Sequence, residues 1–196
     1  AIAAGVTPHM GPGPVVLNVA VPAGAQVILP DVVDAMGVSG SGALEITADG
    51  ALVVTSRTYS QVGGGADCYP GGTLGQSLRA TSGGLGMGVG QAAVIPQLQE
   101  NAAYRSNVAV INTGAGPASV RVHLFDGAGQ ELATYDVALD AGEWKQENQP
   151  FKRKAGQSDM AAGFVRIEVL AGSGVIAYGS VVDNTTNDPT TMEMIR

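Results

Sequence analysis

The chain is poor in aromatic and in charged side chains. Of its 196 residues, 5% are Phe, Trp or Tyr and 14% are Asp, Glu, Lys or Arg, against about a quarter charged in typical globular proteins. A packed core must therefore come mainly from Val, Ile, Leu and Ala, within a hydrophobic fraction of 45%. There is one cysteine, Cys68, which excludes an intrachain disulfide framework.

Basic side chains are scarce as well. The chain has 10 Lys and Arg against 17 Asp and Glu, a net charge of −7, and its densest basic run is "KRK" at 152–154. Nucleic acids and anionic membrane surfaces are bound through basic patches, so we expect neither as a partner. No apolar run approaches the roughly 20 residues of a membrane-spanning helix, so we expect no membrane insertion.

The chain begins with the small-residue string "AIAAG", which is typical of a mature start after removal of a leader. The absence of disulfides is compatible with export, because many bacterial secreted proteins lack them. We therefore expect an extracellular or cell-surface location in a bacterium.

Short β-branched segments bounded by Gly, Pro or Asp dominate the sequence and predict β-strands. One segment, residues 30–36, predicts a short helix with Asp31 as N-cap and Gly37 as its end. Strands at this spacing favour an all-β fold of the sandwich type. The predicted strands span 15–21, 26–29, 43–47, 52–60, 107–112, 119–126, 132–139, 164–169 and 175–183, and residues 92–98 offer a further candidate strand.

The sequence also repeats itself. "VAVPAG" at 19–24 returns as "VALDAG" at 137–142, 118 residues later. Two further segments return in the same order, which indicates a tandem duplication. They are "GALEIT" (42–47) with "GFVRIEV" (163–169), and "LVVTSRTYSQ" (52–61) with "VIAYGSVVDN" (175–184).

The repeat predicts two tandem β-sandwich modules. The N-terminal module would span 1–82 and the C-terminal module 91–196, with a Gly-rich linker at 83–90. The second copy has strands at 107–112 and 119–126 before its "VALDAG", whereas the first copy has only fourteen Pro- and Gly-rich residues before residue 15. We therefore expect the first module to be truncated at its N-terminus and to lack its opening hairpin.

The residues of the second copy resemble a known family. "QAAVIPQLQENAAYRSNVAVINTGAGPASVRVHLFDGAGQELATYDVALDAGEWKQ" and the later "AYGSVVDNTTNDPT" (177–190) are similar to tandem immunoglobulin-like (cell-adhesion-related) repeat modules of bacterial secreted proteins. Such modules are often found behind extracellular proteases. The resemblance implies immunoglobulin-like sandwiches and no single activity.

One loop is a candidate calcium site. "DNTTNDP" (183–189) brings together Asp183, Asn184, Asn187 and Asp188, whose oxygens are ligands of the kind Ca²⁺ takes. The spacing is not that of a helix-loop-helix calcium loop. The alternative is an Asx-rich turn whose side chains cap their own backbone, and we favour it. We expect no other cofactor.

Other functional patterns are weak. His9, His123 and Cys68 are too scattered to predict a zinc site. "GVSGSG" (37–42) is no nucleophile elbow, and "GGLGMGVG" (83–90) lacks the Lys-Ser/Thr of a phosphate loop, so we expect no enzyme activity. Trp144 is a candidate ligand-binding residue that could stack on a sugar or anchor a protein partner. The alternative for Trp144 is a rim aromatic at the sandwich end.

These observations predict a non-catalytic extracellular structural or adhesion module. A missing hairpin would leave an open sheet edge, and prolines 8, 12 and 14 make residues 1–14 a poor strand to cover it. We therefore expect self-association by strand exchange with a neighbouring subunit. The alternative is a carbohydrate-binding accessory module of a secreted enzyme with Trp144 in its platform, and a secreted hydrolase ranks last.

Overall fold

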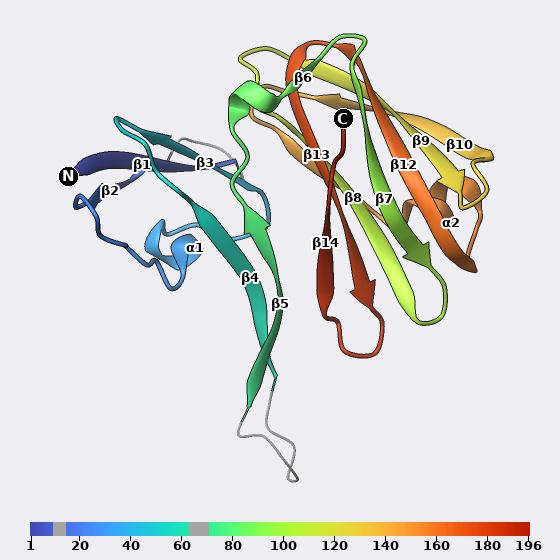
Figure 1. Cartoon of the computed structure of the whole chain (residues 1–196), viewed down its shortest axis with the longest axis horizontal. Helices are drawn as coiled ribbons and strands as arrows, with labels where there is room; N and C mark the ends of the chain where they lie inside the picture. The colour runs from blue at the N-terminus through green and yellow to red at the C-terminus, as the bar shows by residue number, and fades with distance from the viewer. Residues whose placement is uncertain (10–14, 63–70) are drawn as a thin grey trace. The chain divides into compact units, whose positions relative to one another are not determined.

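The computed structural model describes residues 1–9, 15–62 and 71–196, and it confirms the predicted all-β class (Figure 1). The chain forms two compact units, Ala1–Val54 and Thr55–Arg196. This division lies earlier than the predicted boundary at 83–90. The reason is the hairpin of β4 (Thr55–Val62) and β5 (Gly72–Arg79), which hydrogen-bonds to the C-terminal part of the second unit.

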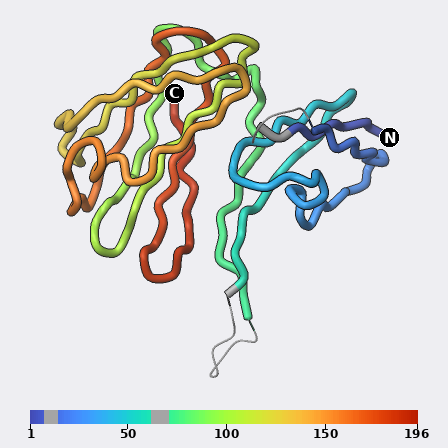
Figure 2. Tube along the Cα trace, turned by 180° about the vertical axis from the view of Figure 1, so that it is seen from behind, coloured from blue at the N-terminus to red at the C-terminus, as the bar shows by residue number. Residues whose placement is uncertain are grey.

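The second unit is built around two facing antiparallel sheets (Figure 2). One has the strand order β10-β9-β12-β7, with bounds Glu131–Leu139, Ala118–Asp126, Met160–Ala171 and Ala92–Glu100. The other has the order β11-β8-β13-β14, with bounds Trp144–Asn148, Tyr104–Asn112, Ser173–Asp183 and Pro189–Glu193. The short helix α2, Pro150–Ala155, follows β11.

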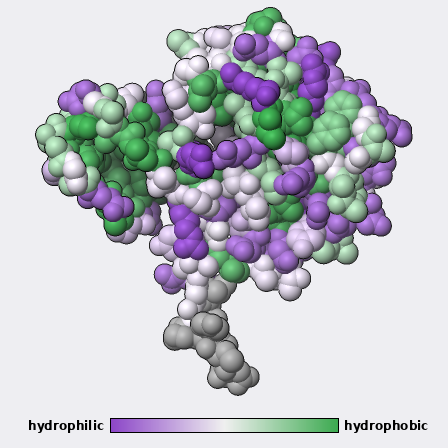
Figure 3. All heavy atoms as spheres, in the orientation of Figure 1, coloured by the Kyte–Doolittle hydropathy of each residue, from purple (hydrophilic) through white to green (hydrophobic). Residues whose placement is uncertain are grey.

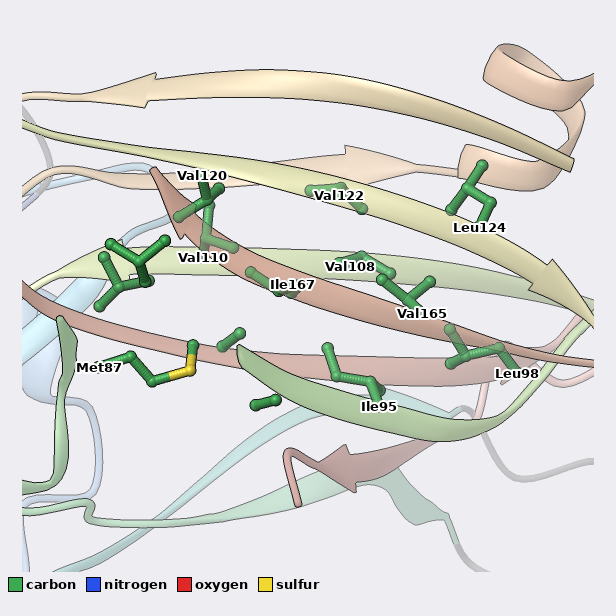
Figure 4. Close-up of a cluster of buried hydrophobic side chains, with 14 of the residues drawn as sticks. Met87, Ile95, Leu98, Val108, Val110, Val120, Val122, Leu124, Val165 and Ile167 are labelled. Atoms are coloured by element: carbon green, nitrogen blue, oxygen red, sulfur yellow. The ribbon is translucent and has the colours of Figure 1, made fainter. Parts of the chain in front are cut away.

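Alternating apolar residues of both sheets form the core. Val120, Val122 and Leu124 of β9 are at most 1% exposed and point inward, as the period-two pattern predicts (Figure 4). They meet Val108 and Val110 of β8 from the opposite sheet. Full burial of each such side chain contributes roughly 1.5–3 kcal/mol to folding, so this layer holds the sandwich together.

The predicted linker at 83–90 belongs to the sandwich instead. It contains the 3₁₀ turn η1 (Gly83–Leu85) and the strand β6 (Met87–Gly88), which pairs with β13. Met87 is fully buried in the core. The glycines permit this close packing, because a Cβ on Gly86 would lie 2.4 Å from the Gly174 Cα.

The first unit, Ala1–Val54, has one sheet of order β2-β1-β3, with bounds Leu17–Val21, Ile2–His9 and Ala43–Ala48. The predicted helix is present as α1 (Val32–Ala35), where the Asp31 carboxylate accepts from the Asp34 N–H at 2.9 Å. Gly37 ends it with φ 65°.

Strand β1 corrects the expectation that residues 1–14 make a poor strand, because it lies at the centre of this sheet. The physical reason is the position of its proline. The Asp49 N–H donates to the Ala3 carbonyl, so every second residue of β1, counted from Ala3, bonds toward β3. Pro8 is not one of these residues, and its nitrogen therefore points away from β3. On that other side β2 begins at Leu17, opposite Val6, so Pro8 loses no hydrogen bond to a described strand.

The two sequence copies match strand by strand. Ala4 of β1 stands opposite Val19 and Ala48, and Val120 of β9 stands opposite Val137 and Val169. Val137 follows Val19 by 118 residues and Val169 follows Ala48 by 121, which are the spacings of the sequence repeat. The order β2-β1-β3 therefore corresponds to β10-β9-β12.

This correspondence identifies what the first copy lacks. Among the described residues of Ala1–Val54, the three strands correspond to β9, β10 and β12, and none of them corresponds to β7 or β8. The predicted strand at 26–29 is not formed. Its counterpart is β11, whose pairing partner is β8, and no described strand of Ala1–Val54 corresponds to β8.

Candidate functional site

Trp144 lies on the outer face of the β11-β8-β13-β14 sheet. Its neighbour across the strands is Ile111, whose neighbour in turn is Ile176, so three apolar side chains form one row across three strands. The adjacent positions Val110 and Ala177 belong to the core, which places this row on the opposite face. All three side chains of the row are half-buried.

The next row places Tyr178 and Gln146 on either side of Ala109. Ala109 is 1% exposed although it lies on the outer face, so its larger neighbours cover it. Burial raises the pKa of Tyr178, and a hydrogen bond from Trp144 acts in the opposite direction. Trp144 and Tyr178 thus meet over Ala109. We call Trp144, Ile111, Ile176 and Tyr178 the Trp144 patch.

The candidate calcium loop carries the hydrogen bonds of an Asx turn. The Asp183 Oδ1 atom accepts from the backbone N–H groups of Thr185 at 2.7 Å and Thr186 at 2.8 Å. These bonds lower the pKa of Asp183.

Arg105 supplies a positive charge to the same loop. Its Nη1 donates to the Asn184 Oδ1 and its Nη2 to the Asn187 Oδ1, both at 3.0 Å. The Asp188 Oδ1 accepts from the Gly75 N–H at 3.1 Å. The four predicted ligands therefore share a loop, and the Oδ1 atom of each already accepts a hydrogen bond. Within residues 1–9, 15–62 and 71–196, no cluster of three or more His, Cys, Asp or Glu side chains is placed to hold a metal ion.

This loop also joins two hairpins. The Asn184 side-chain amide donates to the carbonyls of Asn101 at 3.2 Å and Ala102 at 3.1 Å, in the turn between β7 and β8. Both views show the β7–β8 and β13–β14 turns side by side at one end of the sandwich (Figure 1, Figure 2). The polar residues of 183–188 therefore tie this end together.

The outer face of the β10-β9-β12-β7 sheet carries a second polar and aromatic group. The His123 Nδ1 lies 2.8 Å from the Glu131 Oε2, and its Nε2 lies 3.8 Å from the Glu168 Oε2. The rings of Phe125 and Phe164 stack with centroids 4.7 Å apart and an angle of 6°. Because these two rings stack on one another, they do not offer a row of open ring faces to a sugar.

A crevice of about 190 Å³ lies where the edges of β10 and β11 approach, below the roughly 300–1,000 Å³ of typical ligand pockets. Burial raises the pKa of Tyr135 far above its usual range. Lys154 covers this ring, with its Nζ 5.2 Å from the ring centroid and 3.3 Å from Glu147. The lining consists of Val108, Val110, Val122, Tyr135, Val137, Lys145, Gln146 and Glu147. It is mainly apolar, and its two charged residues pair with residues outside the lining, Lys145 with Glu143 and Glu147 with Lys154.

Two buried polar residues that the sequence analysis missed organise the sandwich. Glu100 is 3% exposed and accepts from the N–H groups of Phe151 and Lys152 in the first turn of α2. Asn112 is fully buried and donates to the carbonyls of Gly116 and Asp140. Neither has a sequence signature, because their partners lie in other segments.

The remaining predicted residues are not brought together. Cys68 lies outside the described residues. His9 ends β1, and its side chain also lies outside what the structure describes. His123 lies on an outer sheet face, and its side chain is only 15% exposed because Glu131 and Glu168 enclose it.

The described part of the chain has no helix long and apolar enough to cross a membrane. No protein-family model matches the sequence. No curated protein matches it either.

Two solved structures are similar in part. Protein 1070 of Thermotoga maritima is 16% identical, with a TM-score of 0.42 over 56% of this chain and 93% of that chain. FlgD from Xanthomonas campestris, a hook-capping protein of flagellar assembly, is 19% identical, with a TM-score of 0.27 over 54% of this chain and 68% of that chain. Both TM-scores lie below 0.5, so neither likeness informs the function of this chain.

Proposed function

We propose that the chain is a non-catalytic structural or adhesion module of a bacterial secreted or cell-surface protein, and that it associates with other chains through an open sheet edge. The observation that carries this proposal concerns the described residues of the first unit, Ala1–Val54. Its sheet ends at β3, whereas the corresponding strand β12 is flanked on both sides by β9 and β7. A strand edge of this kind is a common site of association between chains.

The small core of the first unit supports the same proposal. Its described buried apolar residues are Ala4, Val6 and Met36, whereas the sandwich buries a contiguous cluster. A three-stranded sheet with so little buried area is marginally stable alone. Hydrophobic residues are exposed on this unit (Figure 3), among them Val16 at 51% and Ile28 at 71%. Exposed apolar surface of this extent is typical of interaction sites.

Two ionisable groups of the sandwich favour a structural role over a catalytic one. Arg121 and Asp136 form a bidentate pair across β9 and β10, and Glu100 caps α2. Each of these groups is held in place by its hydrogen bonds.

Light scattering of the purified full chain over a wide concentration range tests the proposal. The mean molar mass should rise with concentration, and proline at Ala48, on the outer edge of β3, should suppress the rise. The matched control is Ala141→Pro, which places proline in the turn between β10 and β11, where the Glu143 N–H donates to the Asp140 carbonyl. A chain that stays monomeric throughout contradicts self-association.

The alternative function is a carbohydrate-binding accessory module, which the Trp144 patch favours. Half-exposed Trp144 lies beside Ile111 on a sheet face, and aromatic side chains of this kind stack on sugar rings. Retention on insoluble polysaccharides tests this alternative. Trp144→Ala should abolish retention and Phe125→Ala, on the other outer face, should not. Absence of retention of the unmodified chain on every polysaccharide contradicts it.

A further inference from the structure

We infer that the crevice between β10 and β11 is a binding site for one small uncharged aromatic molecule of the size of benzene or phenol. The site lies within the second unit, Thr55–Arg196, and does not depend on the proposed association between chains. Three features of the crevice point to such a ligand. They are the charged residues at inward positions of an edge strand, the volume that these residues leave unfilled, and the pairing of their charges.

Strand β11 places charged residues at positions that face the core. Lys145 stands opposite Val110. Glu147 stands opposite Val108, and both valines point into the core between the two sheets (Figure 4). Residues directly opposite one another on neighbouring strands share a face of the sheet, so Lys145 and Glu147 leave the backbone on its inner face. A charged head group loses its hydration in an apolar core, so both side chains have to extend toward solvent.

The charged ends of these side chains form the rim of the crevice. The Lys145 Nζ donates to the Ala138 carbonyl of β10 at 2.7 Å and lies 3.1 Å from the Glu143 Oε2. The Glu147 Oε2 lies 3.3 Å from the Lys154 Nζ of α2. The side chains of Lys145 and Lys154 are 47% and 37% exposed, so the rim reaches solvent. The charged residues therefore bridge β11 to its neighbours and leave the space beneath them unfilled.

Other parts of the sandwich are closed by apolar side chains. On the side of β7 and β14, Ile95 and Leu98 are fully buried, and Met192 and Met194 pack against the same core. Helix α2 contacts β8, β9 and β10, and it fills the adjoining part of the core with Phe151, which is fully buried. The crevice is thus the part of the core boundary where β11 offers charged residues in place of apolar ones.

The volume and the lining of the crevice fit one aromatic ring. Its volume is about 190 Å³, and an apolar cavity of about 150 Å³ is large enough to bind benzene. Its floor is made of Val108, Val110 and Val122, which are at most 4% exposed. The ring of Tyr135 forms part of the wall. An aromatic ligand gains from packing beside another ring, in addition to the area that it buries.

The pairing of the rim charges favours an uncharged ligand. Lys145 is paired with Glu143. Glu147 is paired with Lys154 and lies 3.8 Å from Arg153. An ionised ligand would have to displace one of these partners or carry an unpaired charge onto the valine floor, and either costs free energy. A neutral ring needs neither change, because it replaces water at apolar side chains.

Phenol, which is uncharged at neutral pH, is the probe, and NMR of the valine methyl groups in the full-length chain is the measurement. The methyl signals of Val108, Val122 and Val137 should shift saturably, with a dissociation constant on the order of 1 mM. Those of Ile111 and Ile176 in the Trp144 patch should not shift. Cyclohexanol, the saturated counterpart, should bind about threefold more weakly, and benzoate, the charged counterpart, about tenfold more weakly.

Two variants test where phenol binds. Val137→Phe fills the crevice with a ring of the chain's own and should weaken phenol binding by about tenfold or more. The matched control is Thr134→Phe, which adds the same ring to β10 at an exposed position opposite His123, on the outer face, and should leave binding within about twofold. Lys145→Leu puts an apolar side chain at the inward position, so it should close the crevice, weaken binding and raise the melting temperature. This second variant keeps the test decisive if Val137→Phe does not fold.

Saturable shifts that are confined to the crevice valines and are lost in either crevice variant support the inference. Shifts that grow linearly with phenol, or that follow Ile111 and Ile176 in place of the valines, overturn it. Unchanged phenol binding in both Val137→Phe and Lys145→Leu also overturns it. Benzoate that binds as tightly as phenol overturns the assignment to an uncharged ligand, and cyclohexanol that binds as tightly overturns the assignment to an aromatic one.

Discussion

Glu100 offers the sharpest test of how the sandwich is held together. Its carboxylate accepts from the N–H groups of Phe151 at 3.1 Å and Lys152 at 2.9 Å, and so fixes the first turn of α2 against the end of β7. Phe151 in that turn is fully buried. Glu100→Ala removes the acceptor of both N–H groups and loosens the contact of this ring with the core.

The magnitude follows from these contacts. Each hydrogen bond to a charged group contributes about 1.5–3 kcal/mol, and removal of the carboxylate recovers part of its desolvation cost. We expect Glu100→Ala to lower the free energy of unfolding of the sandwich by about 2–4 kcal/mol. Glu100→Gln keeps one acceptor and should lose about half as much.

The effect should depend on pH with a defined sign. Burial raises the pKa of Glu100 above 4.5, against the opposing hydrogen bonds from Lys152 and Phe151. The folded protein therefore binds the proton more tightly than the unfolded chain. The stability that this gives is complete below pH 4.5 and is lost as the pH rises through the raised pKa. Since Gln does not titrate, the deficit of Glu100→Gln should widen as the pH falls through this window.

Urea denaturation followed by the fluorescence of Trp144, the single tryptophan, measures this stability in the sandwich. The matched control is Glu193→Ala, an exposed carboxylate on β14, which should change stability by less than about 0.5 kcal/mol. A Glu100→Ala chain within about 0.5 kcal/mol of the unmodified chain would refute the reasoning.

Three further outcomes are expected. Asn112→Ala should destabilise the sandwich by about 2–4 kcal/mol in the same assay, because it removes a fully buried side chain that donates to the carbonyls of Gly116 and Asp140 and accepts from the Gly114 N–H. An unchanged midpoint would contradict this. EDTA should leave the melting temperature unchanged, because Arg105 and backbone N–H groups already donate to side-chain oxygens of the loop at Asp183. A fall in the melting temperature that Ca²⁺ reverses would show a bound ion. A thiol reagent should label Cys68 in the native chain, since glycines dominate its neighbourhood in the sequence, and protection until unfolding would argue against exposure.

Local pattern was sufficient for much of the fold. The alternation of Val120, Val122 and Leu124 predicted both the strand and the face that is buried, because side-chain direction in a strand follows directly from sequence spacing. The cap at Asp31 and the glycine end of α1 were predicted for the same reason, since both act within one turn of helix.

The candidate sites also differ in whether their contacts could be predicted from local sequence. The Asx turn at Asp183 depends on residues two and three positions away, and it could be predicted from the loop itself. The hydrogen bonds of Arg105 to Asn184 and Asn187 could not be predicted, because about eighty residues of chain separate the partners. The meeting of Trp144 with Tyr178 over Ala109 likewise depends on the order and register of three strands.

The sequence by itself determined the all-β class, most of the strands and the existence of a repeat, because these depend on period-two patterns and on the identity of short strings. Tertiary structure decided what the repeat lacks. Strand β1 is central because Ala4, Gly5 and Val6 have partners in both β2 and β3, whereas residues 26–29 have no partner strand among the described residues of Ala1–Val54. Strand pairing joins segments far apart in the chain, so a strand-like sequence forms a strand only where the fold places another edge beside it.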